Sequence, residues 1–309
     1  MNLSRHVREI SVAAAYLLVL AILAFARPAF FHVQFGLTWI GTAPVLVAAV
    51  GMTLVIIARQ IDISIGSMFS VCGVIAALLA KAGLPMPIVA LATLATGALL
   101  GAGNGVLIAF MGLPSIVVTL ATMVILRQSL NWIRQGQQVQ GLPASFQWLG
   151  LSQASGGMAL LIAGFGVLLI FGWAAKYLSA GRAVYAVGSD QEAARLAGIR
   201  PRVVVFSIFA LMGALTGLAA MMNAMRFPQV DTNAGSGLEL QVIAAVVVGG
   251  ASISGGRGNL WGTLAGVALL TIIAPALVFL HQPPEWEQAV QGAIILIAVA
   301  SDGLSRRAA

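Results

Sequence analysis

Residues 86–110, MPIVALATLATGALLGAGNGVLIAF, form an apolar run that contains no ionisable side chain. A helix crosses the hydrocarbon core of a bilayer, about 30 Å thick, with roughly 20 residues, so this run is long enough to span it. Lipid offers no hydrogen-bond partners, and only helices and closed barrels satisfy the backbone there. Because the run does not alternate between polar and apolar residues, it predicts a transmembrane helix.

The rest of the chain has the same character. Of its 309 residues, 60% are hydrophobic and 8% are charged, whereas about a quarter of the residues in a soluble domain are charged. The composition predicts an all-α protein, a polytopic membrane helical bundle of about ten transmembrane helices in a single domain, residues 1–309. The expected spans are 11–26, 40–58, 65–80, 86–110, 115–133, 158–175, 203–225, 239–253, 260–280 and 289–301.

Some of these spans have alternative interpretations. The short spans 65–80 and 239–253, and the span 115–133, are candidates for broken or re-entrant helices. The basic start and apolar run of residues 1–26 also fit a cleaved signal peptide. Since Arg27-Pro28-Ala29-Phe30 is a poor small-residue cleavage site, we expect the first span to be retained.

The basic residues predict the orientation of the spans. A net charge of +7 would suggest a nucleic-acid partner for a soluble chain, but in a membrane protein basic residues gather in cytoplasmic loops. With the N-terminus inside, eleven basic residues are cytoplasmic, namely Arg5, Arg8, Arg59, Lys176, Arg182, Arg195, Arg200, Arg202, Arg257, Arg306 and Arg307. Only Arg27, Lys81, Arg134 and Arg226 lie outside. Both termini are therefore expected in the cytoplasm.

Glycine recurs at every fourth position in or next to three expected spans, at Gly97/Gly101/Gly105, Gly213/Gly217 and Gly258/Gly262/Gly266. This spacing places the glycines on one helix face, where the absence of side chains lets a neighbouring backbone approach closely. The pattern predicts a tightly packed bundle.

Ionisable side chains are scarce inside the expected spans. Asp62, Glu239 and Asp302 are expected at span ends, and Arg127 is near enough to the outer end of its span to reach the interface. The interior polar residues are neutral: Thr93, Thr96, Asn104, Thr119, Thr122, Ser129, Asn131, Ser207, Thr216, Asn223, Thr263 and Thr271. Such a lining favours a neutral hydroxylated solute over an ion, although for any single member a hydrogen bond between helices is favoured over a contact with the solute.

The sequence contains no catalytic or metal-binding motif. Only two lysines exist, Lys81 and Lys176, and neither fits GxxxxGK[ST], so the chain has no P-loop for ATP phosphates. HExxH and GxSxG are also missing, and the single cysteine, Cys72, excludes an intrachain disulfide. Energy for uphill transport would have to come from another chain.

The longest expected cytoplasmic loop, residues 176–202, reads KYLSAGRAVYAVGSDQEAARLAGIRPR. Ser189-Asp190 offers an N-cap, the residues 191–197 favour a helix, and Gly198 ends it. The loop is therefore expected to hold one short helix outside the membrane. It exposes alanines rather than several large apolar side chains, which favours insertion into a partner's groove over a place on the membrane surface.

Glu192-Ala193-Ala194, followed after three residues by Gly198, resembles the EAA-x-x-x-G motif of bacterial ATP-binding-cassette importer permeases. Other blocks are similar to one branch of that superfamily, the permeases of ribose, xylose, rhamnose and autoinducer-2 importers. These blocks are GMTLVII at 51–57, IDISIGS at 61–67, LPSIVVTLAT at 113–122 and GSGLELQVIAAVVVGGASISGGRG at 235–258. Gly141-Leu142-Pro143-Ala144, the compact 134–157 loop and Arg59 are most similar to autoinducer-2 permeases.

The resemblance implies a permease subunit of a bacterial inner-membrane importer that moves a monosaccharide or sugar-like solute into the cytoplasm. Its implied partners are a dimer of ATPase subunits, a second permease in a homodimer or heterodimer, and a periplasmic solute-binding protein. ATP and Mg²⁺ would be held by the ATPase, with no cofactor in this chain. The coupling helix would contact the ATPase through Glu192, Ala193, Ala194 and Gly198.

The solute path is expected to include Asn104, Thr119, Asn131 and Asn223. Asp231 and Glu239, on the outer side, are candidates for contact with the binding protein, ordinary solvation being the alternative. Two other functions compete with the importer permease. A stand-alone secondary transporter needs buried carboxylates for ion coupling, and an intramembrane enzyme needs a catalytic constellation; the sequence predicts neither.

Overall fold

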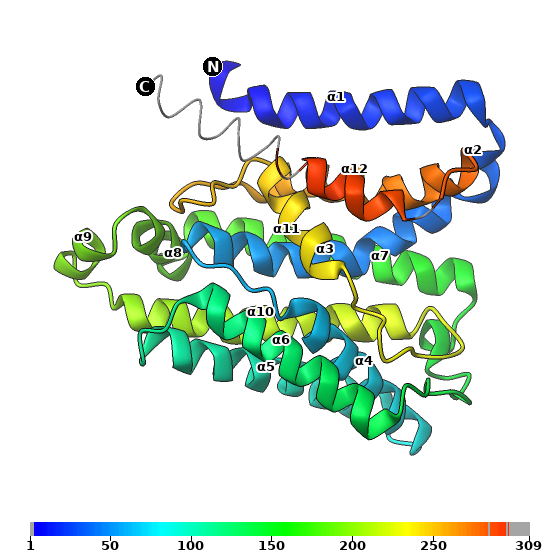
Figure 1. The fold of residues 1–309 in the computed structure, drawn as a ribbon, viewed down its shortest axis with the longest axis horizontal. Coiled ribbons are helices and arrows are strands. Elements are labelled where there is room, and N and C mark those ends of the chain that lie inside the picture. Colours follow the sequence, from blue (N-terminus) through cyan, green and yellow to red (C-terminus); the bar gives the residue numbers. More distant parts are fainter. Residues whose placement is uncertain (1–2, 284, 295, 297–309) are drawn as a thin grey trace.

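The computed structural model describes residues 3–283, 285–294 and 296, and these residues form a helical bundle (Figure 1). Its elements are α1 (Leu3–Ala26), α2 (Ala29–Val33), α3 (Phe35–Ile57), α4 (Ile65–Lys81), α5 (Met86–Ala109), α6 (Ser115–Arg134), the 3₁₀ turn η1 (Gln147–Gly150), α7 (Gln153–Tyr177), α8 (Ser179–Ser189), α9 (Gln191–Leu196), α10 (Pro201–Ala224), α11 (Leu238–Val248) and α12 (Leu260–Phe279). Within the described ranges the only β-type pairing is one antiparallel bridge, Val139 with Val230. The prediction of an all-α membrane bundle is confirmed.

Among the described residues, six helices are long and apolar enough to cross a membrane, namely α3, α5, α6, α7, α10 and α12. Shorter apolar helices are Val12–Ala26 within α1, α4 and α11. The candidate break in the span 115–133 is absent, since α6 runs unbroken through it. Residues 286–294 are helical, but most of the expected span 289–301 lies outside the described residues, so the count of about ten stays a prediction.

Helices α5 and α10 pack with their backbones in direct contact. A methyl group on Gly97 would collide with the carbonyl oxygen of Gly213, and one on Gly213 would collide with that of Gly97. Gly217 meets the carbonyl of Thr93 in the same way. The predicted glycine packing is therefore confirmed for these two helices. Helix α10 also packs on α3 and α4, which makes it the centre of the bundle.

Helices α4 and α11 begin inside the bundle. Helix α11 has only 11 residues, so it rises about 16 Å, roughly half of the hydrocarbon thickness. Gly66, in the first turn of α4, and Gly235, just before α11, contact each other's carbonyl oxygens. The predicted span 239–253 is wrong at its C-terminal end, because Gly249 and Gly250, the latter with φ of +98°, end the helix.

The bundle has two distinct ends (Figure 1). One end carries α8, α9 and the segment 250–259, and α1 begins there. We call this the α9 end. The opposite end carries α2, η1 and the segment 226–237, and we call it the α2 end. The backbone N–H of Trp148 donates to the carbonyl of Met225 (2.9 Å), which joins η1 to the end of α10.

The glycine contact predicts a position-specific effect on stability. Gly97→Ala places a methyl group against the α10 backbone and is expected to lower the free energy of unfolding by about 1–3 kcal/mol. Gly103, on the same helix, is exposed and has open space around its α-carbon, so Gly103→Ala is the matched control and should cost nothing. Thermal unfolding of the purified variants in detergent measures both. Equal losses would contradict the packing.

Candidate functional site

Helix α9 forms as the sequence predicts. The Asp190 carboxylate accepts hydrogen bonds from the backbone N–H groups of Glu192 (2.8 Å) and Ala193 (3.0 Å), which satisfies two of the groups that a helix start leaves unpaired. Gly198 ends the helix with φ of +82°, a conformation that glycine adopts without steric cost. The capped helix protrudes at the α9 end (Figure 1).

Helix α9 has one exposed face and one face that is buried against the bundle. Glu192 is exposed and pairs with Arg195 at 2.6 Å, but Ala194 is only 4% exposed and packs into the core. The helix face that carries Ala194 points back at the bundle, and its contact with a partner stays a prediction. Leu196, which the sequence analysis did not select, is 80% exposed. Its spacing from Glu192, four residues, places both on one face of a helix and would have identified it.

Helix α8 connects α9 to the bundle interior. A methyl group on Gly188 would collide with the carbonyl oxygen of Ile57, the last residue of α3. That carbonyl accepts a hydrogen bond from the backbone N–H of Gly256 (2.8 Å), and the Tyr185 hydroxyl donates to the carbonyl of Gly258 (3.0 Å). Burial raises the pKa of Tyr185, so its hydroxyl stays protonated and able to donate. A displacement of α8 would therefore displace the C-terminal end of α3.

A buried polar cluster joins α4, α5 and α6. The Asn104 amide donates to Ser64 Oγ (2.9 Å) and accepts from Thr122 Oγ1 (2.6 Å). Asp62 accepts from the Ser64 backbone N–H (2.9 Å) and hydroxyl (2.5 Å), and Thr119 Oγ1 donates to the Ser115 carbonyl (2.8 Å). Asp62 has no exposed surface. Asp62 lies just before the first residue of α4, at a span end as predicted. It is buried because the 58–64 segment runs into the bundle before α4 begins (Figure 1).

A second buried charge lies at the start of α11. Glu239 is 8% exposed, and its Oε1 lies 3.5 Å from Arg127 Nη2 of α6. Its other carboxylate oxygen fits against Gly66, where any side chain would displace it. The expected solvation of Glu239 is therefore wrong, because its carboxylate is buried and pairs with Arg127. Its contact with a binding protein stays a prediction. The cause of the burial is the short α11, whose first turn lies in the interior.

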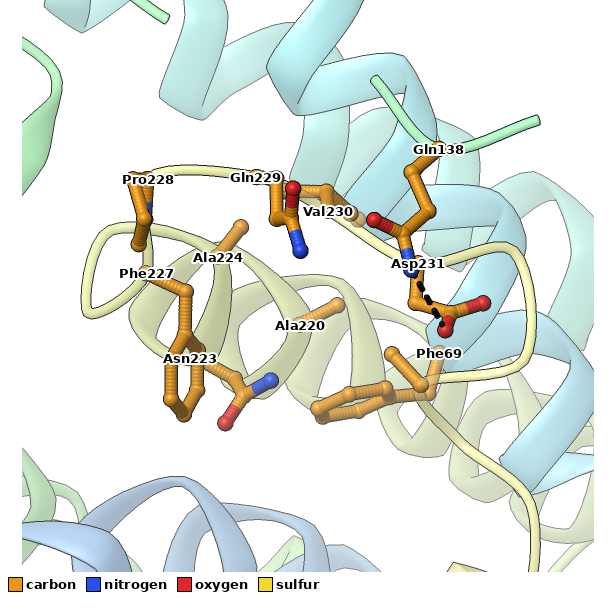
Figure 2. A pocket seen from close by; sticks show the side chains of 12 residues that line it. Phe69, Gln138, Ala220, Asn223, Ala224, Phe227, Pro228, Gln229, Val230 and Asp231 are labelled. Carbon is orange, nitrogen blue, oxygen red and sulfur yellow. Dashed lines mark hydrogen bonds between the residues drawn. The ribbon is translucent and has the colours of Figure 1, made fainter. Parts of the chain in front are cut away.

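The four residues expected along the solute path do not share one surface. Asn104 and Thr119 flank the 61–64 segment. Asn131 lies about 18 Å further along α6 than Thr119, by helical rise, and its Oδ1 is buried without a hydrogen-bond partner among the described residues. Asn223, near the end of α10, lines a cavity of about 440 Å³ at the α2 end (Figure 2).

That cavity was not predicted from the sequence. It lies between α4, the end of α10 and the segment 227–234, and Figure 2 shows the amides of Gln138, Asn223 and Gln229 around it. The Gln138 amide donates to Asp231 Oδ2 (3.2 Å). Asp231, expected on the outer side, is thus part of its wall. Within the described residues, no group of three or more His, Cys, Asp or Glu side chains is placed to hold a metal ion.

Comparison with known proteins identifies a family and a set of relatives. Residues 34–299 match the family described as branched-chain amino acid transport system / permease component. The chain is 34% identical over 305 residues to the autoinducer 2 import system permease protein LsrC of Escherichia coli O157:H7, covering 97% of this chain and 88% of the relative.

The proteins of the same name from other bacteria are similarly related. Identity is 33% over 302 residues for Enterobacter sp. (strain 638), covering 97% of this chain and 88% of the relative. It is 35% over 266 residues for Salmonella paratyphi B, covering 84% and 75%. No solved structure matches the chain significantly.

The Arg127–Glu239 ion pair predicts non-additive effects on stability. Removing one partner leaves a buried charge unpaired, so Arg127→Met or Glu239→Met alone should cost about 3 kcal/mol, at the lower end of the range for buried pairs, because Arg127 remains 28% exposed. The double variant should recover most of that loss. Chemical unfolding in detergent measures all three.

The exposed pair Glu192–Arg195 is the matched control. Replacing either partner there by Met should change the free energy of unfolding by less than about 1 kcal/mol. Additive losses at Arg127 and Glu239 would contradict a direct interaction between the two charges.

Proposed function

Because the chain belongs to the branched-chain amino acid transport system / permease component family, and is therefore a permease subunit of an ATP-binding-cassette importer, we propose that it carries a monosaccharide or sugar-like solute into the cytoplasm. It is a multi-pass inner-membrane protein and a transport subunit, not an enzyme. The solute class is that of autoinducer-2, rhamnose, ribose and xylose.

The identity of the relatives carries the proposal on the solute. They are described as autoinducer 2 import permeases and match nearly the whole chain at 34% identity. The Asn223 amide, which lines the cavity at the α2 end, supports the same class because it suits a neutral, hydroxylated molecule. Of the two buried carboxylates, Asp62 accepts from Ser64 through one oxygen and Glu239 pairs with Arg127 through one oxygen.

The transport cycle requires partners. Members of this family work with an ATPase and a substrate-binding protein, and we infer that the ATPase dimer alone binds ATP and Mg²⁺. We infer further that α9 docks into the ATPase through Glu192, Ala193 and Leu196. Gly198 ends the helix and sets the direction of the chain after it, and Ala194 packs α9 against the bundle. The contact of Gly188 with Ile57 supports a route by which a movement of α9, driven by the ATPase, reaches α3.

The proposed orientation places the α9 end in the cytoplasm. The exposed basic residues Arg182, Arg195, Arg200 and Arg202 gather near α9, as the bias of Lys and Arg toward cytoplasmic loops requires. Both termini are then cytoplasmic, and the α2 end faces the periplasmic binding protein. A second permease, identical or similar, would complete the path. We keep Asn104, Thr119, Asn131 and Asn223 as the proposed path residues, of which Asn223 has direct support from the cavity.

Uptake measurements test the proposed function. Proteoliposomes with this chain, its ATPase and its binding protein should accumulate labelled L-rhamnose, D-ribose or autoinducer-2 only when ATP is enclosed with the ATPase. An ionophore that abolishes proton and sodium gradients should leave uptake unchanged. Uptake that needs a gradient and no ATP would instead indicate a secondary transporter.

Substitutions in α9 test the coupling proposal. Glu192→Ala, Leu196→Glu and Gly198→Ala should abolish uptake while the protein still inserts into the membrane. Gly198→Ala acts through the backbone, since a left-handed conformation costs a non-glycine residue about 1–2 kcal/mol. Leu196→Glu should also prevent co-purification of the ATPase.

Leu151→Glu provides the matched control, because Leu151 is an exposed leucine at the α2 end. It should leave ATPase co-purification unchanged. Normal uptake in the Glu192, Leu196 and Gly198 variants would show that α9 is not the coupling element.

A further inference from the structure

We propose that two adjoining cavities at the α2 end form a binding site for one neutral, polyhydroxylated solute of monosaccharide size. This inference rests on the proposed function and adds the site at which the permease first holds its solute. The larger cavity has a volume of about 440 Å³ and the smaller about 200 Å³. Small-molecule sites occupy about 300–1,000 Å³, so the space suits a single sugar.

Small residues create the larger cavity. Gly73 of α4 and Ala220 and Ala224 of α10 line it together with Ala234. A methyl group on Gly73 would meet only ordinary contacts, Val230 at 3.6 Å and the Ala220 carbonyl at 4.0 Å, so the wall is open there. The bridge between Val139 and Val230, with N···O distances of 2.9 and 3.0 Å, holds the rim.

The polar groups of the wall offer both donors and acceptors. A guanidinium only donates, so the Asn223 carbonyl oxygen, which lies 3.4 Å from Arg226 Nη1, accepts and leaves the amide NH₂ free to donate. A carboxylate only accepts, so Gln138 donates its NH₂ to Asp231 and keeps its carbonyl oxygen free. Figure 2 shows these groups and the Gln229 amide around the same space. A hydroxyl group donates and accepts at once and matches this pattern.

Two aromatic rings complete the wall. Phe69 and Phe227 line the larger cavity (Figure 2), and their faces suit the C–H surface of a sugar ring. The charged residues of the two linings are carboxylates, Asp231 in the larger cavity and Glu287 in the smaller. Asp231 accepts from the Gln138 amide (3.2 Å) and Glu287 from the Gln291 amide (3.0 Å). An anionic solute is therefore disfavoured, and the amide groups suit a neutral solute with hydroxyl groups.

Phe69 and Asn223 stand between the two cavities. Both residues, with Ala234, line the larger and the smaller space. The smaller cavity extends to Pro44 of α3, to Leu238 and Gln241 of α11, and to Gln288. A solute held by Asn223 would thus reach the start of α11 by passing Phe69, which is largely buried.

Cysteine protection tests the site directly. The only cysteine, Cys72, is buried. In a Cys72→Ala background, an introduced cysteine is the only thiol that can be alkylated. Ala234→Cys introduces a thiol at an exposed position that lines both cavities and removes no polar group. D-ribose, D-xylose or L-rhamnose at saturating concentration should slow its alkylation by a polar maleimide at least several-fold. D-glucuronate, an anionic sugar, should not.

Ala154→Cys is the matched control, because Ala154 is an exposed alanine in the first turn of α7, at the same end of the bundle and outside the cavity lining. No sugar should protect it. Adding Asn223→Leu or Gln138→Leu to Ala234→Cys should weaken protection roughly 2- to 10-fold, as expected for the loss of one hydrogen bond. Absence of protection by any neutral sugar, or equal protection of Ala154→Cys, would overturn the site.

Uptake by the complete importer separates this inference from the proposed function. If wild-type uptake is ATP-driven and Ala234→Cys is not protected, the site is wrong and the function stands. If Ala234→Cys is protected and no ATP-driven uptake occurs, the site stands and the proposed function is wrong. With both correct, Asn223→Leu should reduce sugar uptake while the ATPase activity of the complex is maintained.

Discussion

The contact between the backbones of α5 and α10 is the constraint on which the rest of the structure depends. Lipid tails are as apolar as the side chains of a membrane helix, so burying those side chains against another helix gives little hydrophobic stabilisation. Helices in a membrane therefore associate where their backbones can pack closely. Gly97 and Gly213 provide that contact. Helix α10 has 24 residues, about 36 Å in length, and carries α9 near its first residue and Asn223 near its last. One helix therefore positions both the docking end and the solute cavity.

The short helices α4 and α11 begin inside the bundle and so bring polar groups into its interior. Helices that cross the whole membrane would begin at its surface and would not do so. Their N-terminal ends meet at Gly66 and Gly235, where the positive ends of two helix dipoles favour negative charge. Asp62 and Glu239 supply that charge. Ser64 and Arg127 then hold these carboxylates, so the buried charge stabilises the junction of four helices.

Much of the fold could be predicted from the sequence, and the site only in part. Hydropathy located the long helices, the glycine spacing identified the packed faces, and Asp190 with Gly198 defined α9 within a residue. The burial of Glu239 and of Ala194 could not be predicted, since no local pattern tells whether a helix begins inside a bundle or which face of a short helix turns inward. The cavity was missed because its wall joins residues from α4, α10 and two loops that are distant in sequence.

The sequence by itself determined that this protein is an α-helical membrane permease, because apolar runs of membrane length leave the backbone no alternative to helices, and because the EAA block and its companion motifs lie in order along the chain. The tertiary structure alone decided which polar groups meet. Asn104 with Ser64, Arg127 with Glu239, and Gln138 with Asp231 are pairs 40 to 112 residues apart. Their contact depends on helix packing, which brings distant residues to one place and which no single segment encodes.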